Sequence, residues 1–308
     1  MSDVVNIQGG APLLNERKNY WTLDIVKFIC ALIIISAHYA NEWGHYPALI
    51  DYVFSIYIIA VPFFFACSGF LFFAKLNSIP TKEGKFAYFI KYQKRIWIMY
   101  GLWTAVYFTY ILWDWIVKDE LSIEVFLRWL HNALVVQTYS TIWFLPALAV
   151  GVAIIYFLVS RLTKAQMIAL CVILYFLGML GYTYSFALEG TFVGKIYDVY
   201  YLIFKATRNG LFNAAPYIYM GCLATSQCQS PSKSKAIKYG VCAGVSLLLM
   251  IGECFILKLK FNVSGMDICF FVAVFTYFLL MTALNIDIKG MPLFIWLRKL
   301  LPKKKLSE

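Results

Sequence analysis

Charged residues are scarce in this sequence. They make up 14% of the 308 residues, whereas an ordinary soluble domain carries about 25%. Hydrophobic residues make up 62%, and apolar segments of about 20 residues, the length that crosses a hydrocarbon core, recur between charged breaks. So few charges cannot cover a water-facing surface. We therefore predict an integral membrane protein whose partner is the lipid bilayer.

Signatures of metal and nucleotide chemistry are also absent. The sequence has three histidines, no HExxH motif, no Walker-type glycine loop and no cluster of metal ligands. Its eight cysteines are scattered, mostly inside apolar segments, without a CxxC pair, which is typical of small buried hydrophobes. We predict no metal, no permanently bound cofactor and no nucleotide hydrolysis.

The net charge of +11 arises in short loops rather than in a basic soluble domain. Nucleic acid is therefore not a predicted partner. Residues 1–20 are polar and lead directly into a full-length apolar segment, so no cleaved targeting segment is expected.

Eight apolar segments are predicted to be membrane-spanning helices. The fold class is then all-α, a polytopic transmembrane helix bundle of about eight spans. A further apolar patch, Met291 to Leu301, is too short to count as a span. The eight segments are Leu23 to Tyr39, Val53 to Phe73, Ile96 to Val117, Ile142 to Ser160, Met167 to Thr183, Leu211 to Ser226, Ile237 to Leu257 and Ile268 to Asn285.

The loops separate into two classes by their basic residues, and the basic class is expected in the cytoplasm. Asn41 to Asp51 has no Lys or Arg, and Asp114 to Thr141 has four acidic residues against Lys118 and Arg128, so both are predicted to face outward. Tyr184 to Asn209 is also predicted to face outward, and its Lys195, Lys205 and Arg208 are only partly balanced by Glu189 and Asp198. An even number of spans then places the N-terminus and the C-terminus in the cytoplasm. The basic residues on the cytoplasmic side include Arg17, Lys18, Lys75, Lys82, Lys85, Lys91, Lys94, Arg95, Arg161, Lys164, Lys233, Lys235 and Lys238.

The first apolar segment carries three ionisable residues on one face. Lys27 and His38 follow Asp24 by 3 and 14 positions, so at about 100° per residue the three fall within a stripe about 60° wide. A charge inside a spanning helix costs about 2.5–3.5 kcal/mol, so such residues mark candidate functional sites. The alternative is structural: Asp24 and Lys27 pair at the helix end, and His38 caps the other end.

Glu253 interrupts the seventh apolar segment. It should therefore face the bundle interior or a polar partner. A structural hydrogen bond is the default interpretation, and a proton or substrate contact is the alternative.

Several motifs resemble the acyltransferase family 3 of membrane proteins. The segment from Leu23 to His38, which begins LDxxKFxxA and ends in His38, is similar to the family's opening helix, with Lys27 in place of the usual Arg. The VPFFF and TRNGLF segments look closest to the membrane domain of VanT-type serine racemases, although no racemase domain is present. Further matches, in the family's order, are Val61 to Phe70, the cluster Lys91, Lys94 and Arg95 followed by Tyr100 and Trp103, Ile142 to Leu148, and Thr207 to Phe212 followed by Gly221.

The resemblance implies an O-acyltransferase of the plasma membrane. Such an enzyme moves an acyl group, usually acetyl, from cytoplasmic acyl-coenzyme A to a hydroxyl of a cell-envelope glycan or a lipid-linked sugar. It also implies three parts: a polar cytoplasmic segment (1–20), a transmembrane acyltransferase-3-like domain (21–301) that lacks the family's last helices, and a basic cytoplasmic tail (302–308).

The resemblance and the charge layout together imply site residues. His38 would be the general base, because imidazole is partly neutral at physiological pH, and Asp24 would pair with Lys27 and shape the donor channel. Donor phosphates would be held by Lys27, Lys91, Lys94 and Arg95, near a helix start with free backbone N–H groups. Arg208, Trp143 and Glu253 are predicted to contact the substrate, and snorkelling of Arg208 to the membrane interface is the alternative. Ordinary positive-inside anchoring is the alternative role of the basic cluster.

Two other functions remain open. A charged stripe through a bundle could line the pathway of a carrier for a small polar solute or an amino acid. The chain could also be an inactive partner subunit, and homo-oligomerisation is left open.

Overall fold

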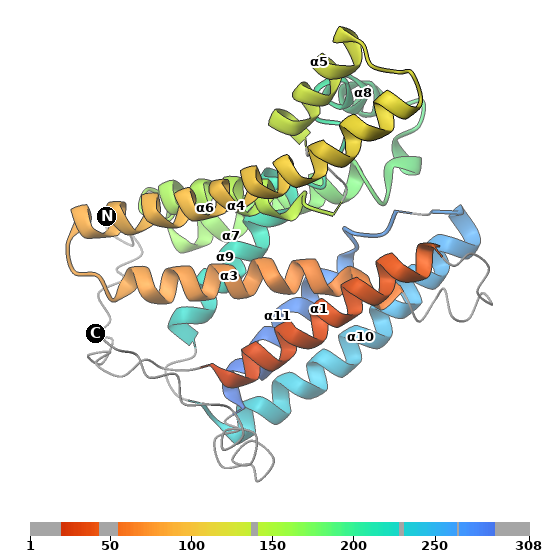
Figure 1. The fold of residues 1–308 in the computed structure, drawn as a ribbon. Coiled ribbons are helices and arrows are strands. Elements are labelled where there is room, and N and C mark those ends of the chain that lie inside the picture. Colours follow the sequence, from red (N-terminus) through yellow and green to blue (C-terminus); the bar gives the residue numbers. More distant parts are fainter. Residues whose placement is uncertain (1–19, 43–54, 137–140, 228–230, 264, 287–308) are drawn as a thin grey trace, which may run out of the picture.

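A computed structural model describes residues 20–42, 55–136, 141–227, 231–263 and 265–286 (Figure 1). Every regular element in these ranges is a helix, which confirms the all-α prediction for this part of the chain. The predicted segment 1–20, apart from Tyr20, the patch Met291 to Leu301 and the tail 302–308 lie outside the described residues.

Four helices are long and apolar enough to cross a membrane. They are α1 (Trp21–Glu42), α3 (Ala60–Asn77) with the preceding 3-10 helix η1 (Ser55–Ile59), α4 (Lys82–Val117) and α10 (Lys233–Phe261). Each of the eight predicted segments overlaps one of these helices or a shorter one. The shorter helices are α6 (Phe144–Leu158), α7 (Lys164–Leu180), α9 (Ala215–Gln227) with the preceding π-helix η4 (Gly210–Ala214), and α11 (Phe270–Asn285).

Helix α4 begins fourteen residues earlier than the apolar segment that predicted it. The side chain of Thr81 caps the helix by accepting a hydrogen bond from Gly84 N at 3.1 Å, as an N-cap threonine does. The 36 residues of α4 span about 54 Å, well beyond the roughly 30 Å of hydrocarbon. The sequence analysis placed the basic residues before Ile96 in a loop, and for residues 82–95 this prediction was wrong. These residues are helical but charged, so average hydropathy does not reveal them as part of the helix.

Helices α3 and α9 pack closely at the centre of the bundle. A Cβ atom on Gly69 would lie 2.3 Å from Ile218 O, and one on Gly221 would lie 2.1 Å from Ala66 O. Both distances are shorter than any non-bonded contact, so only glycine fits. Small residues that let two backbones approach are a common device of helix packing in membranes.

Helices α10 and α11 run antiparallel, and α11 lies against α1 and α3 (Figure 1). Asn262 ends α10 in the left-handed region, with φ of 51°. The Thr22 hydroxyl donates to Ile286 O at 2.9 Å, which joins the first turn of α1 to the end of α11. The α10–α11 turn therefore lies at the end of the bundle toward which α1 runs.

Two segments predicted as outward loops contain helices. They are α5 (Ile123–His131) with the π-helix η2 (Asn132–Val136), and α8 (Phe192–Phe204) with the 3-10 helix η3 (Ser185–Leu188). Figure 1 shows α5 and α8 together at one end of the molecule, beside the C-terminal part of α4. Aromatic packing holds α5 there, with the rings of Phe108 and Trp129 4.4 Å apart.

Candidate functional site

Asp24 and Lys27 form an ion pair in the first turns of α1, with Lys27 Nζ 2.7 Å from Asp24 Oδ1. Both side chains are partly exposed. The aromatic rings of Tyr20 and Phe70 meet edge to face at 5.0 Å and hold the start of α1 against α3. The pair predicted from the spacing is thus present, and its catalytic role stays a prediction.

His38 lies on α1 with an exposed side chain and makes no hydrogen bond or ion pair with the described residues. The buried face of α1 is instead formed by Leu23, Cys30 and Ala37. Removal of the imidazole should therefore leave the packing of the described helices intact. The general-base role of His38 stays a prediction.

Lys91, Lys94 and Arg95 lie well inside α4 rather than at its start. Their backbone N–H groups are used within the helix, so the expectation of free N–H groups beside them was wrong. The three side chains are exposed and share one helix face. This stretch of α4 packs on α6, where Gln93 Nε2 donates to Ala149 O at 2.8 Å and Phe89 stacks on Tyr156 at 4.3 Å.

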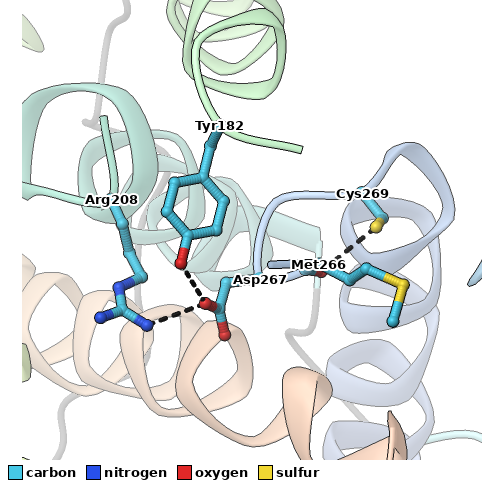
Figure 2. A network of polar contacts seen from close by, with 5 residues as sticks. All are labelled: Tyr182, Arg208, Met266, Asp267 and Cys269. Carbon is cyan, nitrogen blue, oxygen red and sulfur yellow. Dashed lines mark hydrogen bonds and ion pairs between the residues drawn. The ribbon is translucent and has the colours of Figure 1, made fainter. Parts of the chain in front are cut away.

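Arg208 lies in a polar cluster with Tyr182 and Asp267 (Figure 2). Arg208 Nη1 is 2.8 Å from Asp267 Oδ2, and the Tyr182 hydroxyl donates to the same oxygen at 3.0 Å. The guanidinium carbon also lies 4.7 Å from the ring centroid of Trp143 and 5.7 Å from that of Tyr182, within cation–π range. Arg208 and Trp143, both predicted from sequence, are thus brought together.

The residues on either side of Arg208 fix its backbone. The buried Thr207 hydroxyl donates to Gly178 O of α7 at 2.7 Å. The Asn209 side chain caps η4 by accepting hydrogen bonds from Leu211 N and Phe212 N at 3.0 and 3.1 Å. The Thr-Arg-Asn sequence therefore anchors the turn on both sides of Arg208.

Trp143 is buried, with 8% of its surface exposed. One ring face is covered by Arg208, so the indole supports the arginine within the described structure. Its direct contact with a substrate stays a prediction.

Sequence reasoning missed Asp267 and Tyr182. Asp267 could have been found from its position: it directly precedes the eighth predicted span, on the same predicted side of the membrane as Arg208. An unpaired acid and base on one side of a membrane protein are candidates for pairing.

Glu253 meets the start of α11. Its Oε1 accepts hydrogen bonds from Phe270 N at 2.7 Å and from the Tyr184 hydroxyl at 2.5 Å, and its Oε2 accepts one from Phe271 N at 2.9 Å. Burial and the hydrogen bond to Glu253 raise the pKa of Tyr184, so the phenol stays protonated and donates. This is the structural role given as the default, and a substrate contact of Glu253 stays a prediction.

These helices and the polar groups between them define an all-helical membrane protein with a partly exposed Arg–Asp pair at one end of its bundle. Residues 20–300 match the profile of the Acyl_transf_3 family, described as an acyltransferase domain. The chain belongs to this family, which confirms the resemblance seen in its motifs.

The curated relatives include amino-acid racemases. The chain is 26% identical over 233 residues to the serine/alanine racemase of Enterococcus gallinarum. The aligned region covers 74% of this chain and 32% of the relative. It is 24% identical over 212 residues to an amino-acid racemase of Enterococcus faecalis, and this aligned region covers 68% of the chain and 28% of the relative. The chain thus matches about a third of the length of these relatives. No solved structure matches it significantly.

Proposed function

We propose that the protein is a multi-pass O-acyltransferase of the plasma membrane. It would transfer an acyl group, acetyl by preference, from cytoplasmic acyl-coenzyme A to a hydroxyl of a cell-envelope glycan or a lipid-linked sugar. Membership of the acyltransferase family over residues 20–300 is the observation that carries the proposal.

The proposed topology has eight spans with both termini in the cytoplasm. The spans are α1, α3, α4, α6, α7, η4–α9, α10 and α11. Two observations support it. Each of the eight predicted spans overlaps a helix, and α5 and α8, from two of the segments predicted to face outward, lie at the same end of the molecule (Figure 1). The basic extension of α4 before Ile96 would then reach the cytoplasm.

In this proposal the basic face of α4 receives the donor. Lys91, Lys94 and Arg95 are exposed on adjacent turns, so they can pair with several phosphate oxygens at once. Lys27, paired with Asp24, would add a cation beside α3.

His38 would take the proton from the acceptor hydroxyl as the oxygen attacks the thioester carbonyl carbon, and coenzyme A would leave as the thiolate. A positioned general base contributes about 10²- to 10⁴-fold to the rate. Asp24 and His38 are fourteen residues apart, about 21 Å along the helix, so Asp24 would act on the donor side rather than on the histidine. Transfer through an acyl-histidine intermediate is the alternative route.

The test is transfer of radiolabelled acetyl from acetyl-coenzyme A in membranes that contain the wild type or His38→Gln at equal expression. We expect labelled envelope material from the wild type and a loss of at least about 100-fold in the variant. Absence of label from both, with suitable acceptors present and the protein folded, would favour a carrier or an inactive partner subunit.

An amino-acid carrier is the second candidate, because the curated relatives are named for serine, alanine and other amino acids. This function predicts uptake of labelled serine or alanine into vesicles that survives the His38→Gln change. Acyl transfer predicts no such uptake.

A further inference from the structure

Asp267 restricts the direction in which Arg208 points. One carboxylate oxygen, Oδ2, accepts hydrogen bonds from both the Arg208 guanidinium and the Tyr182 hydroxyl (Figure 2). Tyr182 follows α7, and Asp267 lies in the turn between α10 and α11, so the carboxylate joins parts of the chain far apart in sequence. An arginine has many side-chain conformations, and ordering it without a partner costs entropy. Asp267 therefore holds the guanidinium in one of them.

The pair retains polar atoms that can meet a ligand. Oδ1 of Asp267 and the guanidinium nitrogens other than Nη1 make no hydrogen bond to any of the described residues. The side chains of Arg208 and Asp267 keep 23% and 18% of their surface exposed. A hydrogen-bond acceptor and several donors thus stand side by side at a partly desolvated position. A hydroxyl group, which both donates and accepts, can satisfy both.

The charge of the pair favours an uncharged ligand. Arg208 and Asp267 neutralise each other, and the Tyr182 phenol that donates to Asp267 adds no charge. A phosphate or carboxylate that approached Arg208 would also meet the Asp267 carboxylate, and two like charges in contact repel each other. A neutral hydroxyl meets no such penalty.

We infer that Asp267 is a positioning residue which, together with Tyr182, holds Arg208 as a charge-neutral docking point for the hydroxyls of an uncharged saccharide acceptor. This inference rests on the proposed acyl transfer. It names Asp267 and Tyr182 as parts of the acceptor site, and it excludes a uronic acid or a sugar phosphate as the group bound there.

The test measures acetyl transfer from acetyl-coenzyme A in membranes, with a neutral N-acetylglucosamine oligosaccharide and a uronate-containing oligosaccharide of equal length as acceptors. Asp267→Asn should raise the acceptor KM about 10- to 100-fold, the range for a hydrogen bond to a charged group, while the KM for acetyl-coenzyme A stays constant. Asp267→Glu should recover part of the loss. Tyr182→Phe removes one hydrogen bond, keeps the charges and should raise the acceptor KM by a smaller factor.

Asp114→Asn is the matched control. Asp114 forms an exposed ion pair with Lys118 at 2.8 Å on α4, so its loss should change neither KM. For the wild type, the neutral acceptor should be preferred over the uronate.

Each result has one meaning. Absence of label from the wild type overturns the proposed function, and the inference falls with it. A labelled wild type whose Asp267 and Tyr182 variants lose protein level or kcat, without a change in acceptor KM, assigns the cluster a structural role only. A preference for the uronate acceptor also overturns the inference.

Discussion

Glu253 of α10 accepts a hydrogen bond from the backbone N–H of Phe270, the first residue of α11, at 2.7 Å. The first N–H groups of a helix lack partners within the helix, and a carboxylate is favoured there by the helix dipole. The acid that interrupts the seventh apolar segment is therefore the cap of the next helix.

Glu253→Gln should lower stability and leave substrate affinity unchanged. The amide keeps one acceptor but places a donor opposite a backbone N–H, which costs about 1–3 kcal/mol for an unsatisfied buried group. Unfolding of the purified protein in detergent would measure the loss. A raised KM for donor or acceptor at unchanged stability would instead support the substrate contact predicted from sequence.

Arg95→Gln and Lys94→Gln should raise the KM for acetyl-coenzyme A, because each removes a charge-assisted partner of the donor phosphates. We expect a rise in KM of about 10-fold or more for each variant at low ionic strength, and a smaller rise at high ionic strength, because salt screens the charges that the variants remove. Lys118→Gln, at the other end of the same helix and paired with Asp114, is the control. If all three variants had the KM of the wild type for acetyl-coenzyme A, the role of the basic cluster would be positive-inside anchoring only.

Gly221→Ala should destabilise the bundle, because the added Cβ would lie 2.1 Å from Ala66 O and the two helices would have to separate. Overpacking of this kind typically costs about 1–3 kcal/mol. The control is Gly244→Ala on α10, where a Cβ meets no atom within 4 Å and alanine should stabilise the helix by about 0.5–1 kcal/mol. Thermal unfolding in detergent compares the two, and similar effects would contradict the close approach of α3 and α9.

Cysteine labelling can test the proposed topology. Leu121→Cys lies before α5 and is expected to react with a membrane-impermeant maleimide on intact cells. Pro80→Cys, between α3 and α4, should react only after permeabilisation. Both positions are exposed, and the unchanged chain gives the background from its eight native cysteines. The opposite pattern would invert the orientation.

The elements that depend on local sequence were predicted well. Each apolar segment falls on a helix, because the tendency of about 20 apolar residues to form a helix in lipid is a property of that stretch alone. The Asp24–Lys27 pair is also local, since residues three apart share a helix face. The start of α4 was misplaced because the Thr81 cap, rather than average hydropathy, decides where that helix begins.

The pairings between distant residues were decided by tertiary structure alone. Arg208 and Asp267 are 59 positions apart, and Glu253 and Phe270 are 17 apart across a turn. The sequence by itself determined that the chain is helical and belongs in a membrane. It also identified Arg208, Trp143 and Glu253 as candidate functional residues. The packing of α7, η4 and the α10–α11 turn determined which of them meet, because a charge in a water-poor bundle takes the partner that folding brings within hydrogen-bonding distance.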